Sequence, residues 1–251
     1  MPKLLAGRVT LVTGAGSGIG RAIAHGFAAE GAKVVVSDLD ESGGAETAAD
    51  IEKRGGRAIF VRADVSKPEN CEALVAAAVE EFGALHVAVN NAGIAGPSAP
   101  AGEYPVEGWN SVIAVNLSGV FYGMRYQIPA LLDWGGGSIV NVASILGQVG
   151  FRNSAAYVAA KHGVVGLTRN AALEYAARGI RVNAVGPAFI KTPLIEENMT
   201  PEAREKLIAL HPMGRLGEAD EVAELVVWLS SEKASFVTGS YYAIDGGYLA
   251  Q

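Results

Sequence analysis

The chain has 251 residues, of which 50% are hydrophobic, and its 20 basic and 26 acidic residues give a formal net charge of −6. This length suits one α/β domain with a large core, and the lack of a basic block argues against nucleic acid or an anionic membrane as a partner. The single cysteine, Cys71, excludes an intrachain disulfide. With no signal peptide and no apolar run of the ~18 residues that a membrane helix needs, we expect a soluble cytoplasmic protein.

The first predicted strand, residues 9–12, runs into a glycine-rich turn and then into a helical pattern. Gly14, Gly18 and Gly20 have the spacing G-x-x-x-G-x-G, which differs from the dinucleotide fingerprint G-x-G-x-x-G. Glycines let backbone N–H groups approach a phosphate, and the helix N-terminus adds favourable partial charge. By itself, the turn is equally consistent with a tight strand-to-helix connection that binds nothing.

The second predicted strand, residues 33–38, ends in Asp38, which lies 18 residues beyond Gly20. This is close to the place of an acid that accepts hydrogen bonds from an adenosine ribose. Its charge would also repel a 2′-phosphate, and Leu39 rather than an arginine follows. The alternative is that Asp38 caps the helix predicted over residues 41–53. The glycine turn upstream favours the ribose interpretation.

Strands and helices then alternate, which predicts a parallel sheet with right-handed crossovers. The further predicted strands cover residues 58–61, 86–90, 138–142, 180–185 and 241–245. The predicted helices cover residues 68–82, 106–132 (as two helices that meet near Asn116), 154–178 and 218–229, with short helices within 188–213. We expect a single-domain, doubly wound Rossmann-type sheet of about seven strands with helices on both faces. Ligands of such sheets bind at the carboxyl ends of the strands, where Gly14, Asp38, Asp64 and Asn91 fall.

Tyr157 and Lys161 are four residues apart on a predicted helix, so their side chains share one face. A lysine cation beside a phenol favours the phenolate and lowers its pKa. Ser144 follows the neighbouring strand, where its hydroxyl could hold a carbonyl or alcohol oxygen. These groups suit proton transfer to an oxygen while a nicotinamide transfers hydride. The alternatives are a tyrosine at a helix contact and a lysine that reaches solvent.

Taken together, these motifs resemble those of the short-chain dehydrogenases/reductases, and the resemblance covers nearly the whole chain. The matching pieces are Thr13-Gly14-x-x-x-Gly18-Ile19-Gly20, Asp64-Val65, Asn90-Asn91-Ala92-Gly93, Asn116, Ser144, Tyr157-x-x-x-Lys161, Asn183 with Pro187, and Asp245-Gly246. Their joint occurrence is far more specific than any one motif.

The resemblance implies roles for four residues. Tyr157 would be the general acid/base, Lys161 would lower its pKa and bind the nicotinamide ribose, and Ser144 would orient the substrate oxygen. Asn116 would hold a water that links Lys161 to solvent, or would simply kink its helix. The expected NAD-binding residues are Gly14, Ser17, Gly18, Ile19, Gly20, Asp38, Leu39, Asp64, Val65, Asn91, Ala92, Gly93, Tyr157, Lys161, Pro187, Ile190 and Thr192. Asn90 is expected to brace the sheet instead.

The family usually has Pro-Gly after the sixth strand, whereas this chain has Pro187-Ala188. Because alanine tolerates positive φ poorly, the turn could differ there and displace Ile190 and Thr192. Residues 188–213 are expected to form the substrate loops. The expected substrate residues are Ser144, Ile145, Leu146, Val149, Tyr157 and Phe189, and the wider apolar pocket adds Ile94, Leu194, Met199, Leu207 and Met213. These favour a secondary alcohol and ketone with apolar substituents; His211 could add polar recognition or be a structural histidine.

Two other functions remain open at this point. A 3-oxoacyl-carrier-protein reductase would prefer a phosphorylated cofactor and carry basic residues for an acidic carrier. Asp38 opposes the first property, and the helix end at residues 131–134, Leu-Leu-Asp-Trp, lacks the second. A catalytically silent NAD-binding regulatory or scaffold protein would be expected to lose part of the set Asn116, Ser144, Tyr157 and Lys161.

The helices over residues 116–132 and 154–178 are apolar over more than one stripe, which suggests burial against another subunit. The resemblance implies a four-helix contact within a homotetramer. The chain end, residues 245–251, also resembles that of family members whose terminal glutamine meets Mg²⁺ between subunits. Gln251 is therefore a candidate ligand for a structural Mg²⁺, against the alternative of a tail without an ion.

Overall fold

The computed structural model describes residues 3–193 and 200–251 and contains one seven-stranded parallel sheet. Its strand order is β3-β2-β1-β4-β5-β6-β7. The strands are β1 (Val9–Thr13), β2 (Lys33–Asp38), β3 (Arg57–Arg62), β4 (Val87–Asn90), β5 (Gly137–Val142), β6 (Ile180–Pro187) and β7 (Tyr241–Ile244). The predicted doubly wound sheet is confirmed, with strand ends shifted by one to two residues. The order reverses at β1, so ligands are expected beside the carboxyl ends of β1 and β4.

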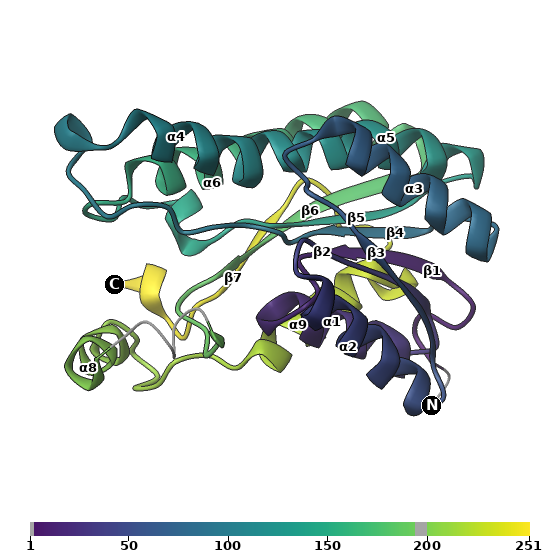
Figure 1. The fold of residues 1–251 in the computed structure, drawn as a ribbon, viewed down its shortest axis with the longest axis horizontal. Coiled ribbons are helices and arrows are strands. Elements are labelled where there is room, and N and C mark those ends of the chain that lie inside the picture. The colour runs from purple at the N-terminus through teal and green to yellow at the C-terminus, as the bar shows by residue number, and fades with distance from the viewer. Residues whose placement is uncertain (1–2, 194–199) are drawn as a thin grey trace.

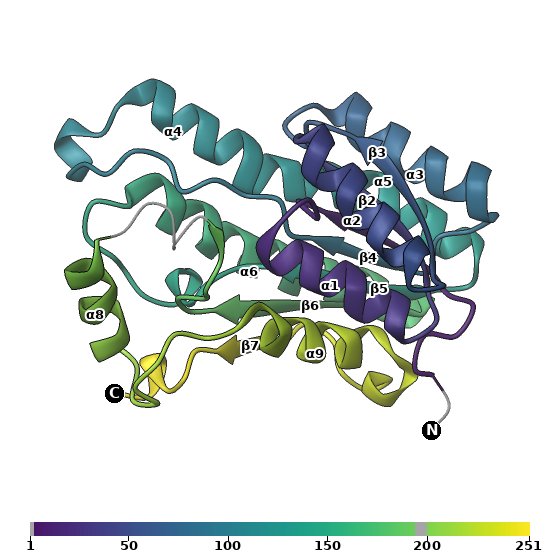
Figure 2. The same cartoon turned by 60° about the horizontal axis from the view of Figure 1, so that its bottom comes forward.

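Helices cover both faces of the sheet, as Figures 1 and 2 show. The helices of one layer are α1 (Gly18–Ala29), α2 (Glu41–Lys53) and α9 (Ala219–Ser230). The helices of the other layer are α3 (Pro68–Phe82), α4 (Val106–Ile113), α5 (Gly119–Asp133) and α6 (Ala155–Tyr175). A further helix, α8 (Pro201–Ala209), lies beyond the carboxyl ends of the strands. No helix within the described ranges is both long and apolar enough to cross a membrane.

Two hydrophobic cores lie on the two faces of the sheet. Phe27 of α1 and Val226 of α9 are fully buried in one, and Leu131 of α5 and Val164 of α6 in the other. Every residue of β1 is buried, because a parallel strand covered on both faces has no solvent side. This double cover explains why the strands appear in the sequence as short continuous apolar runs.

The predicted pair of helices around Asn116 is one continuous run with a change of pitch. A π-helical segment, Ala114–Ser118, joins α4 to α5, and Asn116 sits fully buried at its centre. Single π-helical turns inside α-helices occur often at functional sites, because they redirect side chains and backbone carbonyls. The change of pitch agrees with the predicted kink at Asn116, and the predicted water-holding role of this residue stays a prediction.

The turn after β6 accommodates Ala188 without strain. Asn153 is the one non-glycine residue with positive φ in the described part of the chain, so Ala188 does not need the conformation that glycine favours. Its backbone N–H donates to the carbonyl of Ile244 over 3.1 Å, which ties the turn to β7. Leu194 and Met199, which are expected in the wider apolar pocket, lie outside the described residues.

Candidate functional site

The glycine turn between β1 and α1 is packed so closely that side chains would not fit. Gly14 and Gly18 have φ values of +63° and +50°. A Cβ at position 20 would lie 2.0 Å from the carbonyl oxygen of Gly14, and one at position 18 would lie 3.1 Å from Cγ2 of Thr192. Ser17 is exposed beside this turn, and Ile19 is half-buried. The turn thus brings bare backbone to the carboxyl edge of the sheet.

The segment after β4 is hydrogen-bonded to that turn. Nδ2 of Asn91 donates to the carbonyls of Thr13 and Gly14, over 2.9 Å each. The hydroxyl of Thr13 accepts the backbone N–H groups of Asn91 and Ala92. The Asn91 side chain therefore binds the backbone of the glycine turn. The Thr13 hydroxyl holds the segment after β4 in place, a role that the sequence motif did not reveal.

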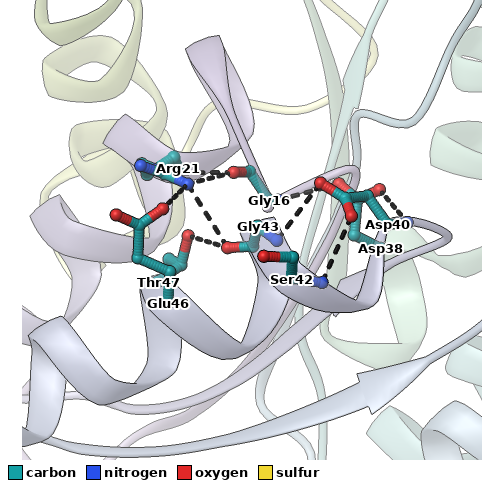
Figure 3. A network of polar contacts seen from close by, with 8 residues as sticks. All are labelled: Gly16, Arg21, Asp38, Asp40, Ser42, Gly43, Glu46 and Thr47. Carbon is teal, nitrogen blue, oxygen red and sulfur yellow. Dashed lines mark hydrogen bonds and ion pairs between the residues drawn. The ribbon is translucent and has the colours of Figure 1, made fainter.

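Asp38 lies against the glycine turn at the end of β2 (Figure 3). Its Oδ2 accepts the N–H of Gly16 over 2.8 Å, and its Oδ1 accepts the N–H of Asp40 over 3.0 Å. The alternative role of Asp38 as the cap of α2 is wrong, because Asp40 caps that helix by accepting from the N–H groups of Ser42 and Gly43. Leu39 between the two acids is 54% exposed. The preferred role of Asp38, binding an adenosine ribose, stays a prediction, and the cap of α2 lies two residues later, at Asp40.

Asp64 and Val65 follow β3, next to the end of β2. Oδ1 of Asp64 accepts the hydroxyl of Ser66 over 2.7 Å and its N–H over 2.9 Å. These hydrogen bonds lower the pKa of the Asp64 carboxyl below its usual value. Val65 is buried, and a Cβ at Gly119 would meet its side chain at 3.0 Å. The pair thus closes the edge of the candidate nucleotide site.

Ser144, Tyr157 and Lys161 come together at the ends of β5 and α6. The Ser144 hydroxyl accepts the N–H of Leu146 over 3.1 Å, and it is close enough to the Tyr157 phenol to lower the pKa of that group. Nζ of Lys161 lies 5.5 Å from the centroid of the Tyr157 ring and donates to the carbonyl of Val142 over 2.8 Å. Ser144 and Lys161 are buried, whereas Tyr157 is half-buried. The prediction that Tyr157 and Lys161 lie on one face of a helix is confirmed.

The expected lowering of the Tyr157 pKa by Lys161 is not what the structure shows. Burial of the phenol raises the pKa of Tyr157, and its hydrogen bond with Ser144 only partly opposes this shift. Burial likewise lowers the pKa of Lys161 from 10.5 to about 8. The loss of hydration disfavours both charged forms and is the largest cause of both shifts. The pKa values of the two groups therefore lie further apart than those of the free side chains.

The side chain of Asn116 is hydrogen-bonded to the loop after β4. Its Oδ1 accepts the N–H of Ile94 and its Nδ2 donates to the carbonyl of Ile94, over 2.8 Å each. A Cβ at Gly93 would lie 3.3 Å from the same oxygen. Asn116 therefore fixes the segment that leads out of the site, in addition to marking the π-helical segment.

Asn90 braces the interior, as predicted. Its amide exchanges hydrogen bonds with Gln127 of α5 and donates to Asn141 of β5, which in turn donates to Thr168 of α6. These side chains are buried. The network links β4 and β5 to α5 and α6.

The segment after β6 runs over the glycine turn. Pro187 and Ile190 are buried, and a Cβ at Gly217 would lie 2.5 Å from Cδ1 of Ile190. Thr192 is half-buried and faces Gly18. The backbone of this segment is thus beside the candidate cofactor site, while the Ile190 side chain is turned into the core.

The expected substrate residues differ in accessibility. Ile145 and Leu146 are buried to 1% and 7% exposure, whereas Val149 and Phe189 are half-buried. The Phe189 ring lies 5.9 Å from Phe151 and 5.8 Å from His211, centroid to centroid. Phe189 and Val149 are therefore better placed to meet a ligand than the side chains of Ile145 and Leu146.

Two residues that the sequence motifs did not single out also contact the site. The phenol of Tyr241 donates to the carbonyl of Ser144 over 3.0 Å. Arg21 donates to the carbonyl of Gly16. Neither contact has a local sequence signal, because Tyr241 is 97 residues from its partner and Arg21 looks like an ordinary helix residue.

The candidate metal ligand at the chain end makes a different contact. Nε2 of Gln251 donates to the carbonyl of Leu210 over 3.0 Å. Within residues 3–193 and 200–251, no cluster of three or more His, Cys, Asp or Glu side chains could hold a metal ion. A cation at Gln251 would thus have to take its other ligands from elsewhere.

Comparisons with known proteins agree with this arrangement. Residues 14–249 match the family model described as enoyl-(acyl carrier protein) reductase. The chain is 51% identical to the cyclohexanol dehydrogenase of Acinetobacter sp. (strain SE19), over 97% of this chain and 96% of that one. Among solved structures, levodione reductase has a TM-score of 0.95 and 40% identity, covering 98% of this chain and 99% of that one. A protein of Agrobacterium tumefaciens, provisionally named 2-deoxy-D-gluconate 3-dehydrogenase and with bound NADP, has a TM-score of 0.91 and 38% identity over 100% and 99%.

Proposed function

Because the chain belongs to the short-chain dehydrogenase/reductase family and is an oxidoreductase of secondary alcohols and ketones, we propose that Ser144, Tyr157 and Lys161 carry its chemistry with NAD(H). The observation that supports this assignment is their convergence at the carboxyl ends of the strands. The alternative of a silent binding protein is disfavoured because the set of polar groups needed for proton transfer is present at one place.

The residues present fit a nicotinamide dinucleotide. A Cβ at Gly14, Gly16 or Gly20 would collide with neighbouring atoms, and such a glycine turn at a helix N-terminus suits a pyrophosphate. Asp38 would hold the adenosine ribose, and Asp64 and Val65 would contact adenine. Gly93 and the backbone of Ala92 would line the next part of the site, and the segment containing Pro187, Ile190 and Thr192 would lie beside the nicotinamide.

The bound cofactor would give hydride to the ketone carbon or take it from the alcohol carbon. Tyr157 would donate a proton to the ketone oxygen in reduction and accept it from the alcohol in oxidation. The Ser144 hydroxyl would hold the same oxygen. Lys161, when charged, favours the phenolate over the phenol, and its N–H groups not used by Val142 are available to the cofactor ribose. Asn116 would contribute through the backbone of the π-helical segment, because its side chain is held by Ile94.

We infer a preference for NAD(H) over NADP(H) from Asp38. Its carboxylate is held at the glycine turn by the N–H of Gly16, and a second acid, Asp40, follows at the start of α2. A 2′-phosphate placed there would meet like charge. A solved relative contains bound NADP, so the fold alone does not select NAD(H), and the inference rests on the acid.

The substrate class that fits is a six-membered cyclic secondary alcohol and its ketone. Half-buried Val149 and Phe189 supply apolar surface at the site, with Phe151 beside Phe189. Cyclohexanol dehydrogenase, which is similar over nearly the whole chain, is named for a six-membered cyclic alcohol. This favours a small cyclic ketone over the acyl-carrier substrate of the alternative reductase.

We also propose that the enzyme assembles as a homotetramer through α5 and α6. A groove of about 560 Å³ runs between these helices and is lined by Met124, Ile128 and Leu167 among others. Phe121 of α5 is 47% exposed and Leu173 of α6 is 85% exposed. A second copy related by a two-fold axis would cover both helices. A Mg²⁺ ion at Gln251, which rests on the resemblance of the chain end, would then take the remaining ligands from a second subunit and water.

Steady-state kinetics with a small panel test this function. Cyclohexanol and cyclohexanone, with NAD(H) and NADP(H), should give turnover in both directions and a higher kcat/KM with NAD(H). An acyclic 3-oxoacyl thioester is the comparison substrate and should react poorly. Equal kcat/KM values with the two cofactors would refute the cofactor assignment, and preference for the thioester would refute the substrate class.

A further inference from the structure

Gly16 is the point at which the glycine turn, the end of β2 and the start of α2 meet (Figure 3). Its N–H donates to Oδ2 of Asp38 over 2.8 Å. Its carbonyl accepts from Nε of Arg21 over 3.0 Å and also from Nη2 of the same guanidinium. The Asp38 carboxylate therefore holds the N–H of Gly16, and the Arg21 guanidinium holds its carbonyl.

The same guanidinium ties two helices together. Arg21 belongs to the first turn of α1, whereas Gly43 and Glu46 belong to α2. Nη2 of Arg21 donates to the Gly43 carbonyl over 3.3 Å and pairs with Oε2 of Glu46 over 2.8 Å. The Arg21 side chain is only 30% exposed, so these charge-assisted hydrogen bonds are partly shielded from water.

There is no free space at this junction. A Cβ at Gly16 would lie 2.9 Å from Oδ2 of Asp38, and one at Gly43 would lie 2.8 Å from the carbonyl oxygen of Gly16. Backbone packs directly on backbone, so a shift of Gly16 moves the group that orients Asp38. The second oxygen of Asp38 accepts from Asp40, whose side chain caps α2, so the carboxylate is fixed at both ends.

From this arrangement we propose that Arg21 is a positioning residue for cofactor selection, which fixes Gly16 and through it the orientation of the Asp38 carboxylate. The inference rests on the proposed function, because it takes Asp38 to face the adenosine ribose. Loss of Arg21 leaves the charge of Asp38 and its hydrogen bond from Asp40 in place, but it frees the Gly16 backbone and so loosens the restraint on Oδ2. Hydrogen bonds with ribose hydroxyls depend on direction, whereas repulsion of a phosphate depends mainly on charge. NADH binding should therefore suffer more than NADPH binding.

Calorimetric titration of the full chain with NADH and with NADPH tests this role. Arg21→Gln should weaken NADH binding about tenfold and NADPH binding by less than about twofold, the effect expected for the loss of one hydrogen bond with a charged partner. Arg8→Gln is the matched control, because it breaks an ion pair of the same 2.8 Å length, with Glu232, away from this junction. It should leave both affinities unchanged.

Arg21→Lys is the second variant, and thermal unfolding is recorded for all of them. Lysine keeps the charge opposite Glu46 but lacks the planar fork that reaches two carbonyls, so its NADH affinity should lie between those of the wild type and Arg21→Gln. If Arg21→Lys keeps the full wild-type preference for NADH, the inference about Arg21 is overturned, even where Arg21→Gln does not fold. That result leaves the proposed function untouched. Equal weakening of both dinucleotides in a folded variant also overturns it. A wild type that binds neither dinucleotide refutes the proposed function itself.

Discussion

The phenol of Tyr241, on the edge strand β7, donates a hydrogen bond to the backbone carbonyl of Ser144 over 3.0 Å. The Tyr241 ring lies directly over Gly186 of β6, where a Cβ would come within 1.8 Å of the phenol oxygen. Burial raises the pKa of Tyr241, so the phenol remains a donor at all working pH values. Two strands thus hold the residue that is proposed to orient the substrate oxygen.

Tyr241→Phe should lower kcat about three- to tenfold, because it removes one hydrogen bond that fixes Ser144 without removing the ring. The dissociation constant for NADH should change little, since Tyr241 contacts the Ser144 side of the site. Stopped-flow kinetics and a binding titration measure the two quantities. Tyr242→Phe, at the next position of the same strand, is the control and should keep full activity; a Tyr241→Phe enzyme with unchanged kcat would show that this contact is dispensable.

The pH dependence should differ between the two directions of the reaction. Alcohol oxidation needs the Tyr157 phenolate, and burial raises the pKa of Tyr157 above its usual value. The reactive fraction in the oxidation direction is therefore small at neutral pH and grows as the pH rises. Ketone reduction needs the phenol and should stay level through neutral pH and fall only in the alkaline range. An oxidation rate that is already level from about pH 6 upward would contradict the role of Tyr157 as base.

Lys161 should cost the cofactor-free protein stability. Its pKa falls from 10.5 to about 8 on folding. Below pH 8 the buried cation is unfavourable, and between pH 8 and 10.5 the unfolded chain binds more protons than the folded one. The free energy of unfolding should therefore rise with pH across that window.

Lys161→Met should remove this slope and stabilise the cofactor-free chain at neutral pH by about 1–3 kcal/mol, with part of the gain offset by the lost hydrogen bond to Val142. Activity should be lost at the same time, as is common when a strained functional group is replaced. Urea unfolding at several pH values measures the effect, with Lys67→Met as a surface control. Destabilisation by Lys161→Met at neutral pH would show that the lysine is not held at a cost.

Assembly through α5 and α6 should depend on Phe121. Phe121→Asp would place a charge in the apolar groove between the helices and should reduce the mass in solution from four chains to one or two. Val79→Asp on α3, where a valine is 41% exposed, is the matched control and should remain tetrameric. Light scattering distinguishes these outcomes, and a monomeric wild-type chain at micromolar concentration would refute the proposed tetramer.

The parallel sheet could be anticipated from sequence because parallel strands buried on both faces appear as continuous apolar runs between helical patterns. The prediction that Tyr157 and Lys161 share a helical face held because side chains four residues apart always do. Asp38 and Asp40 are both acids at the same loop, so the sequence alone could not tell which one caps α2 and which one faces the turn.

Other parts of the site depend on residues far apart in the chain. The contact of Tyr241 with Ser144 joins two strands that the sequence separates by 97 residues, and no local pattern encodes it. The direction of the Tyr157 pKa shift depends on how deeply the phenol is buried, which only the packed structure defines. Arg21 likewise acquires its partners only when α2 packs against the glycine turn.

Isotope transfer from labelled alcohol tests the central claim most directly. Cyclohexanol carrying deuterium on its carbinol carbon is incubated with NAD and the wild-type enzyme, and the reduced cofactor is analysed by mass spectrometry. The account predicts that the deuterium moves to the nicotinamide ring, and that Tyr157→Phe, which still binds NADH, transfers essentially none. Deuterium that fails to reach the cofactor, or full transfer by Tyr157→Phe, would contradict the proposed reaction or its proposed acid/base.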